Sequence, residues 1–263
     1  MREILYGRQP VRETLRAGRR QVFKVLLARG GKSTGIVSQI CTLAEQSKVP
    51  VQMVERRELD RLGGEANHQG LAAEVSGYPY VDLDTVLAAA RLAGEPHFLL
   101  QLDHVQDPQN LGSLLRTAEA AGAHGVIIPG RRAAGVTPAA VRASSGAAEH
   151  VRVVQVTNLV RAMEVLKAEG VWLAGLEAIP EALYYTQADL SGSLGLVVGS
   201  EGQGLARLVR ETCDFLIRLP MHGQIESLNA AVAGAIALYE VRRQRDAKKV
   251  PSDEGTFGGQ GRI

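Results

Sequence analysis

The sequence has few cysteines, no clustered metal ligands and little net charge. Its 263 residues include two cysteines, Cys41 and Cys213, that lie far apart, and six histidines without the spacing of metal ligands. We therefore expect two free thiols in a reducing compartment and no bound metal. The formal net charge is +2, so any basic surface for a nucleic-acid partner must be local.

Long apolar runs are also missing. No run approaches the ~20 residues needed to cross a bilayer, and the opening MREILYGRQP is charged and lacks the apolar centre of a signal peptide. These features favour a cytoplasmic protein with no membrane partner. The apolar share of 45% is ordinary for a globular chain, and the length suffices for one large domain or two smaller ones.

The first part of the chain predicts a small module and a connection. Alternating patterns over residues 1–76 predict a compact α/β module with strands at 22–28, 49–54 and 71–75 and helices at 10–17, 35–47 and 56–62. Residues 77–95 have the composition of a linker and predict one helix over 83–92. The polar, glycine-rich residues 246–263 predict a disordered tail.

A second and stronger alternation covers residues 96–245. Its first strand, 97–103, is apolar throughout, which is typical of a strand buried on both faces of a parallel sheet. Further strands are expected at 125–129, 151–156, 171–176, 194–199 and 215–219, with helices at 110–121, 139–143, 158–169, 205–211 and 227–245. The alternation predicts an α/β domain with a parallel sheet and right-handed crossovers.

Three segments stand at the carboxyl ends of predicted strands, where open α/β sheets bind ligands. The first is DPQNLGSLLR, residues 107–116, in which Asn110 occupies a helix N-cap position and Arg116 lies one to two turns into the helix. Alone, it favours a capped helix with a surface arginine. The polar, turn-rich connection after so apolar a strand points instead to a site.

The other two segments are a glycine-rich turn and a strand-to-helix connection. The turn Gly199-Ser200-Glu201-Gly202 lets the backbone approach a ligand, but it matches no phosphate loop, dinucleotide fingerprint or nucleophile elbow. A solvated Glu201 is the alternative. In the third segment, Ile217–Glu240, Ser227 is expected to cap an alanine-rich helix that could pack closely, for example across a subunit interface.

Taken in order, these segments resemble the three motifs of the SpoU/TrmH branch of the SPOUT RNA methyltransferases. The matching residues are Asp-Pro-x-Asn-x-Gly with its downstream arginine, Gly-Ser-Glu-Gly, and Ile-x-Leu-Pro-Met with Ser-Leu-Asn. The resemblance covers about 150 residues, from Pro96 to Arg245. It implies a SpoU-type methyltransferase domain with a parallel sheet and a trefoil knot, S-adenosylmethionine as the cofactor, and a homodimer.

The N-terminal module resembles the ribosomal-protein-like RNA-binding domain of the RlmB-like subgroup, through residues 4–15 and 67–75. That subgroup includes a methyltransferase of a guanosine ribose in 23S rRNA, so the resemblance implies an RNA substrate-binding domain over residues 1–76 and rRNA as the partner. A local basic cluster and one loop histidine could contact the RNA: Arg8, Arg12, Arg16, Arg19, Arg20 and His68. Solvated surface arginines are the alternative. The basic stretch 242–249 could also bind phosphates or simply end a helix favourably.

The resemblance also implies individual roles. The residues matching the cofactor site are Gly199, Leu219, Pro220, Met221 and Leu228. Those matching the catalytic set are Asn110, Arg116, Glu201, Ser227 and Asn229. The family's arginine is thought to help deprotonate the ribose 2′-hydroxyl. Because a guanidinium is effectively never neutral in a protein, we favour phosphate binding and stabilisation of the developing alkoxide for Arg116.

Other functions remain open at this stage. The resemblance also allows a 2′-O-methyltransferase that acts on tRNA or on an rRNA nucleotide at an antibiotic site. A non-catalytic RNA-binding factor in ribosome assembly belongs to another class, and the retention of Asn110, Arg116, Glu201 and Asn229 disfavours it. A dinucleotide-dependent dehydrogenase is disfavoured by the missing glycine fingerprint.

Overall fold

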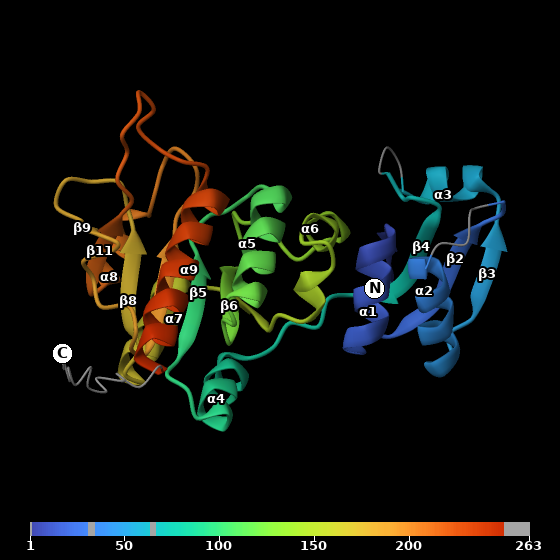
Figure 1. Ribbon diagram of the computed structural model, residues 1–263, viewed down its shortest axis with the longest axis horizontal. Helices are drawn as coiled ribbons and strands as arrows, with labels where there is room; N and C mark the ends of the chain where they lie inside the picture. The colour runs from blue at the N-terminus through green and yellow to red at the C-terminus, as the bar shows by residue number, and fades with distance from the viewer. Residues whose placement is uncertain (1, 31–34, 64–66, 250–263) are drawn as a thin grey trace, which may run out of the picture.

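The computed structural model describes residues 2–30, 35–63 and 67–249, which form two β-sheets with their helices (Figure 1). A four-stranded sheet is built from residues 2–76 and a seven-stranded sheet from residues 98–218. In Figure 1 the two halves lie side by side along the long axis, with the N-terminal half on the right. The molecule is therefore elongated, with one sheet in each half.

The N-terminal sheet is mixed rather than parallel. Its elements are β1 (Arg2–Tyr6), α1 (Arg8–Ala17), β2 (Val22–Ala28), α2 (Gly35–Gln46), β3 (Val51–Val54), α3 (Arg56–Gly63) and β4 (Leu71–Ser76). The strand order is β1-β4-β2-β3, with β4 antiparallel to both neighbours. Strand β1 was not expected from the sequence. It is defined by its pairing with β4, across which Arg2 and Glu74 form an ion pair at 2.6 Å.

The helix expected between the two halves forms as α4 (Leu83–Ala93). It packs against the second sheet, because a Cβ on Gly125 would lie 2.4 Å from a methyl carbon of Val86. Gly94 ends the helix in the left-handed conformation that glycine adopts without strain. The segment is thus part of the packed core of the C-terminal half rather than a free connection.

The C-terminal half is an α/β domain with a parallel sheet, as the sequence predicts. Its elements are β5 (Phe98–Leu102), α5 (Pro108–Ala120), β6 (Gly125–Pro129), α6 (Pro138–Ala143), the 3-10 turn η1 (Ala147–Glu149), β7 (Val153–Val156), α7 (Leu159–Ala168), β8 (Trp172–Leu176), β9 (Leu183–Tyr184), β10 (Leu194–Val198), α8 (Arg207–Thr212), β11 (Phe215–Arg218) and α9 (Ala230–Lys249). The order is β7-β6-β5-β10-β8-β11-β9, and the paired strands run parallel.

Helices cover both faces of this sheet, so its central strands are apolar on both sides. Phe98 and Leu100 of β5 join the core formed with α5, α6 and α9, whereas Leu99 joins the core formed with α4, α7 and α8. Successive strand residues point to opposite faces, and each fully buried Leu or Phe contributes about 1.5–3 kcal/mol. This burial explains why the sequence of β5 shows no polar alternation.

The last helix extends beyond its expected end. Helix α9 continues to Lys249, so residues 246–249 are helical and not part of a disordered tail. Lys249 pairs with Glu95 at 2.9 Å and Lys248 with Asp189 at 3.4 Å, which anchors these residues to the domain. The rest of the expected tail, 250–263, lies outside the described residues, and the trefoil knot stays a prediction. Across the described ranges no helix has the length and hydropathy that spanning a membrane requires.

Two arginines expected to contact RNA instead join the two halves of the molecule. The side chain of Arg20 is 0% exposed and pairs with Glu3 at 2.8 Å and Glu149 at 3.1 Å. Arg19 donates to the carbonyl oxygens of Val151 at 2.5 Å and Pro79 at 3.2 Å. The RNA-binding prediction for Arg20 is therefore wrong, because a guanidinium enclosed by its own ion pairs cannot reach a phosphate.

Candidate active site at the carboxyl edge of the parallel sheet

The three motif segments meet at one edge of the seven-stranded sheet. Strands β5, β10, β8 and β11 are neighbours and run in the same direction, so the loops that follow them gather at one edge. The loop after β5 leads into α5, the loop after β10 is glycine-rich, and the loop after β11 leads into α9. Parallel strands therefore bring together residues that are more than 100 positions apart.

The glycine-rich loop after β10 folds into a tight turn closed on itself. Ser200 and Gly204 exchange backbone hydrogen bonds of 3.2 and 3.1 Å. Gly202 and Gly204 adopt φ of +79° and +64°, a region in which side chains are strained. A Cβ on Gly199 would lie 2.3 Å from the carbonyl group of Gly204. Glycine is thus required here by close approach of two backbone segments.

Two carboxylates hold this loop in place, one after each of the two strands that flank β10. Asp103, which is buried at the end of β5, accepts a hydrogen bond of 2.7 Å from the backbone N–H of Ala206. Glu177, which follows β8, accepts one of 2.9 Å from the backbone N–H of Leu205. Hydrogen bonds to ionised acceptors are the stronger class, so these two fix the far end of the loop to the sheet.

Asn110, Glu201 and Asn229 form one hydrogen-bonded group, and each comes from a different motif. The side-chain amide of Asn229 donates to Oδ1 of Asn110 at 2.9 Å and to the carboxylate of Glu201. The same carboxylate accepts from the backbone N–H of Ala230 at 3.4 Å. The structure thus joins three of the five residues that the resemblance assigns to catalysis.

The helix caps differ from the sequence-based expectation at both motif helices. Asp107, and not Asn110, caps α5: its carboxylate accepts from the N–H of Gln109 at 2.9 Å, and Pro108 occupies the first position, where its missing N–H costs nothing. Asn229, and not Ser227, caps α9, because its Oδ1 accepts from Ala231 and Val232 at 3.0 and 3.2 Å. The side chain of Asn110 is consequently free to bond across the site.

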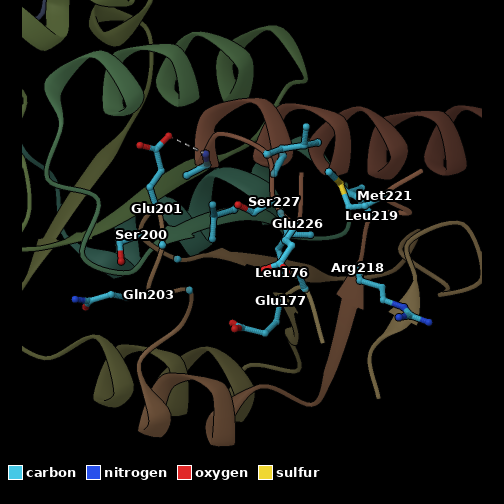
Figure 2. A pocket seen from close by; sticks show the side chains of 18 residues that line it. Leu176, Glu177, Ser200, Glu201, Gln203, Arg218, Leu219, Met221, Glu226 and Ser227 are labelled. Atoms are coloured by element: carbon cyan, nitrogen blue, oxygen red, sulfur yellow. Dashed lines mark hydrogen bonds between the residues drawn. The ribbon is translucent and has the colours of Figure 1, made fainter. Parts of the chain in front are cut away.

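A cavity of about 340 Å³ opens beside the glycine-rich loop (Figure 2). Four of the five residues expected at the cofactor site line it: Gly199, Leu219, Met221 and Leu228. Pro220 is itself described but does not contribute to the lining. The predicted catalytic residues Glu201 and Ser227 also line this cavity. We name it the glycine-loop cavity.

The glycine-loop cavity has acidic and apolar walls. Its carboxylates are Glu177, Glu201 and Glu226, and apolar side chains such as Leu219 and Met221 face them. In Figure 2 the guanidinium of Arg218 points away from this space, and its Cζ lies 4.4 Å from the centre of the Tyr184 ring. The cavity therefore presents negative charge and apolar surface to a ligand.

A second cavity of about 500 Å³ lies on the other side of the same loop, with Ser200, Glu201, Gln203 and Gly204 in both walls. Its remaining lining includes Asn110, His104 and Arg132. We name it the arginine cavity after Arg132. Sequence reasoning missed His104 and Arg132. Both follow strands of the same edge and adopt positive φ, 56° and 55°. Such strained residues gather at functional sites, and the adjoining strand ends were the signal available in the sequence.

Arg116 does not line either cavity. Its exposed guanidinium donates from Nη1 to Oγ of Ser145 at 3.2 Å, on the side of α5 that faces α6. Six residues separate it from Asn110, which is about 9 Å along a helix. Within the chain, the structure therefore brings Asn110, Glu201 and Asn229 together, lines the glycine-loop cavity with Ser227, and leaves Arg116 apart.

The remaining residues predicted to bind RNA divide into accessible and inaccessible side chains. Arg12 and Arg16 lie on α1 and pair with Glu13 at 2.7 and 3.5 Å, while Arg8 donates to the carbonyl oxygen of Gln69 at 3.2 Å. His68 is buried and binds Asp60 at 2.8 Å and the N–H of Gly70 at 3.0 Å. Its prediction as an RNA contact is wrong, because both ring nitrogens are engaged within the fold.

Fold and site together define an α/β enzyme domain with a ligand site at the carboxyl edge of its parallel sheet, preceded by a separate mixed-sheet module. Residues 97–239 match the model of the SpoU rRNA Methylase family, and residues 4–81 match the model described as RNA 2'-O ribose methyltransferase substrate binding. The first match covers more than half of the chain.

Known relatives agree with these matches. The chain is 43% identical over 244 residues to YacO of Bacillus subtilis, named as a TrmH family tRNA/rRNA methyltransferase, covering 93% of this chain and 96% of the relative. The SpoU methyltransferase AviRb from Streptomyces viridochromogenes, solved in complex with AdoMet, superimposes with a TM-score of 0.76 at 27% identity over 94% of this chain and 91% of that one. A structure named as an RNA 2'-O ribose methyltransferase gives 0.74 at 26% identity over 93% and 89%.

The chain belongs to the SpoU rRNA methylase family, also called the SpoU/TrmH family. It is an S-adenosylmethionine-dependent RNA methyltransferase with an N-terminal substrate-binding domain.

Proposed function

We propose that this enzyme methylates the ribose 2′-hydroxyl of an rRNA nucleotide, and that the nucleotide is a guanosine of 23S rRNA. The observation that carries the proposal is the hydrogen-bonded group of Asn110, Glu201 and Asn229, in which Glu201 lines both cavities and Asn110 lines the arginine cavity. One cavity suits a cofactor and the other a nucleotide. The description of the N-terminal family match, which names 2'-O ribose methylation, supports the position of the methyl group.

The glycine-loop cavity has the chemistry that S-adenosylmethionine requires. The cofactor carries a cationic sulfonium and an ammonium group, which suit a cavity containing Glu177, Glu201 and Glu226. Its adenine suits the apolar side chains of Leu219, Met221 and Leu228, and Gly199 allows the backbone to approach it. When bound, S-adenosylmethionine supplies a methyl group already activated for transfer.

The protein's own task is to orient the ribose and to manage one proton. Asn110 and Glu201 reach the arginine cavity, so they can hold a ribose hydroxyl that enters from that side. The Glu201 carboxylate can accept the hydrogen bond of this hydroxyl and polarise it towards the alkoxide. We assign to Arg116 the binding of a neighbouring phosphate and the stabilisation of negative charge, since it stays cationic throughout.

We further propose that the enzyme is a homodimer built around α9. Three apolar side chains, Val232, Ile236 and Tyr239, lie on one face of this helix and are 48%, 38% and 52% exposed. Their spacing of four and three residues places them in one stripe. A second copy that covers the stripe would remove this apolar area from water.

Arg8, Arg12 and Arg16 on α1 remain as the proposed RNA contacts of the N-terminal domain.

A tritiated-methyl assay with purified 23S rRNA, 16S rRNA and tRNA tests the proposed substrate. We expect label in 23S rRNA from cells lacking the gene. Mapping of the alkali-resistant position in the product should place the methyl group on the ribose of a guanosine. Label confined to tRNA would select the other target class named for the Bacillus subtilis relative. A base-methylated product would contradict the 2′-hydroxyl assignment.

The Arg116→Ala variant tests the assigned role of Arg116. We expect turnover to be nearly abolished while S-adenosylmethionine still binds with unchanged affinity in isothermal titration, because Arg116 lies outside the glycine-loop cavity. Methylation by this variant at the wild-type rate would contradict the role assigned to Arg116.

A further inference from the structure

Helices α5 and α6 approach each other closely at Gly112, one helix turn before Arg116, and this approach determines what Arg116 contacts. A Cβ on Gly112 would lie 2.4 Å from Cβ of Ala143 and 2.8 Å from the backbone nitrogen of Ser144, so only glycine permits this approach. Arg116 is four residues further along α5 and therefore on the same face. The close contact at Gly112 brings the chain just after α6 next to the Arg116 guanidinium.

The residue that meets Arg116 has a strained backbone. Ser145 adopts φ of 54°, and its Oγ accepts the 3.2 Å hydrogen bond from Arg116. The N–H groups of Ser145 and Gly146 bond to the carbonyl oxygens of Arg142 and Val141, both at 2.9 Å, which ends α6 in a left-handed turn. A serine disfavours this conformation relative to glycine, so the hydroxyl is retained at a cost.

The N-terminal domain holds this turn from the other side. Gly146 has φ of +89°, and a Cβ there would lie 2.7 Å from Cβ of Glu13 and 3.2 Å from the carbonyl oxygen of Gln9. Helix α1 thus packs directly on the turn. Glu13 also binds Nε2 of His150 at 2.9 Å, at the end of the segment that follows the turn. Helix α1 therefore fixes both ends of residues 145–150.

We propose that Ser145 is a positioning residue that holds the Arg116 guanidinium in its working orientation, and that α1 of the N-terminal domain holds Ser145. This inference rests on the role that the proposed function gives to Arg116. The substrate-binding domain then does more than bind RNA: its docked position sets the geometry of a catalytic side chain. Loss of orientation of such a group lowers the rate of the chemical step rather than substrate affinity.

Ser145→Gly is the direct test, because glycine adopts this left-handed conformation freely and the change removes the hydroxymethyl group that carries Oγ. We expect kcat to fall roughly tenfold, the strength expected of one hydrogen bond to a charged group. The KM for rRNA, the Kd for S-adenosylmethionine and the midpoint of urea unfolding should not worsen. A purely structural role for Ser145 would leave kcat unchanged and would raise stability.

Gly146→Ala tests the contribution of α1, and Gly170→Ala is its matched control. Both glycines have positive φ, +89° and +76°, but nothing lies within 4 Å of a Cβ at Gly170. Both variants should lose stability through backbone strain. Only Gly146→Ala should also lower kcat, because the new methyl group displaces Glu13.

The outcomes separate this inference from the proposed function. Wild-type kcat in Ser145→Gly, together with an inactive Arg116→Ala, overturns the positioning role and leaves the role of Arg116 standing. Equal kcat in Gly146→Ala and Gly170→Ala overturns the contribution of α1. Full activity in Arg116→Ala overturns the proposed role of Arg116 itself.

Discussion

At the scale of single residues, Asn229 combines a structural and a functional bond in one side chain. Its Oδ1 accepts from the first N–H groups of α9, and its Nδ2 donates to Asn110 and Glu201. Any helix cap can satisfy the first requirement, since Ser, Thr, Asp and Asn all do so. The second needs a donor to two acceptors, and of these side chains only the asparagine amide has two N–H groups beside its acceptor oxygen.

Two substitutions at Asn229 separate these bonds. Asn229→Asp keeps the cap but places a carboxylate beside that of Glu201, so we expect methyl transfer to fall at least about 100-fold with nearly unchanged stability. Asn229→Ala loses the cap as well, and urea unfolding should show a cost of about 1 kcal/mol. If Asn229→Asp methylated rRNA like the wild type, the three-residue group would not be part of the catalytic site.

At the scale of elements, the glycine-rich loop is held so tightly that one methyl group should displace it. We expect Gly199→Ala to lower the affinity for S-adenosylmethionine at least about tenfold, because the new Cβ would meet backbone atoms of Gly204 at 2.3 Å and the loop must move. Isothermal titration measures the effect. Gly192→Ala is the control, since nothing lies within 4 Å of a Cβ there. Equal affinities in the two variants would show that the loop does not shape the cofactor site.

The contact between α1 and the segment after α6 should weaken in acid. Burial raises the pKa of Glu13, but hydrogen bonds from His150 and Arg12 and the nearby charge of Arg16 outweigh it, and the net pKa lies below 4.5. A carboxyl with a lowered folded-state pKa stabilises the protein fully above its unfolded value of about 4.3, and this stabilisation is lost as the pH falls through the folded value.

The comparison of wild type with Glu13→Gln isolates this contribution. Urea unfolding at pH 7 should favour the wild type by no more than about 1 kcal/mol, because Arg12, Arg16 and His150, the partners of Glu13, are partly exposed to water. The difference should shrink steadily as the pH is lowered from 5 towards 3. A difference that grows in acid would contradict the sign of the pKa shift.

Elements with a strong local pattern could be predicted from the sequence, and those defined by a partner could not. Strands β5 and β10 are rich in apolar residues because helices cover both faces of the sheet, so their burial can be predicted from their own sequences. Strand β1 begins with Arg2 and Glu3 and exists through its pairing with β4, about 70 positions away. Strand β9 has two residues and depends on β11 in the same way.

The candidate site shows the same division. The resemblance identified Asn110, Glu201 and Asn229, and the structure joins them. The sequence suggested Asn110 and Ser227 as the caps of the two motif helices, whereas the structure caps them with Asp107 and Asn229. The burial of Arg20 against Glu149 could not be foreseen either. The two residues are 129 positions apart, and a cluster of charged residues is normally predicted to lie at the surface.

At the scale of the whole molecule, the position of Arg116 and the apolar stripe on α9 together favour a shared active site. Arg116 faces Ser145 and contributes to neither cavity of its own chain, so we expect it to serve the arginine cavity of the second copy in the proposed homodimer. Sedimentation equilibrium should give a dimer, and Ile236→Asp, which places a charge in the stripe, should shift it towards monomer without unfolding it.

Heterodimers with two different tags test whether the site is shared. A dimer of Arg116→Ala with Glu201→Ala should keep about half of the wild-type activity, because one of its sites then combines an intact Glu201 with an intact Arg116 from the other subunit. A dimer of wild type with the Arg116→Ala/Glu201→Ala double variant should be inactive, since each site lacks one group. Sites formed within one chain would give the opposite pattern, with the first heterodimer inactive and the second at half activity. The pair of measurements therefore decides which subunit supplies the guanidinium.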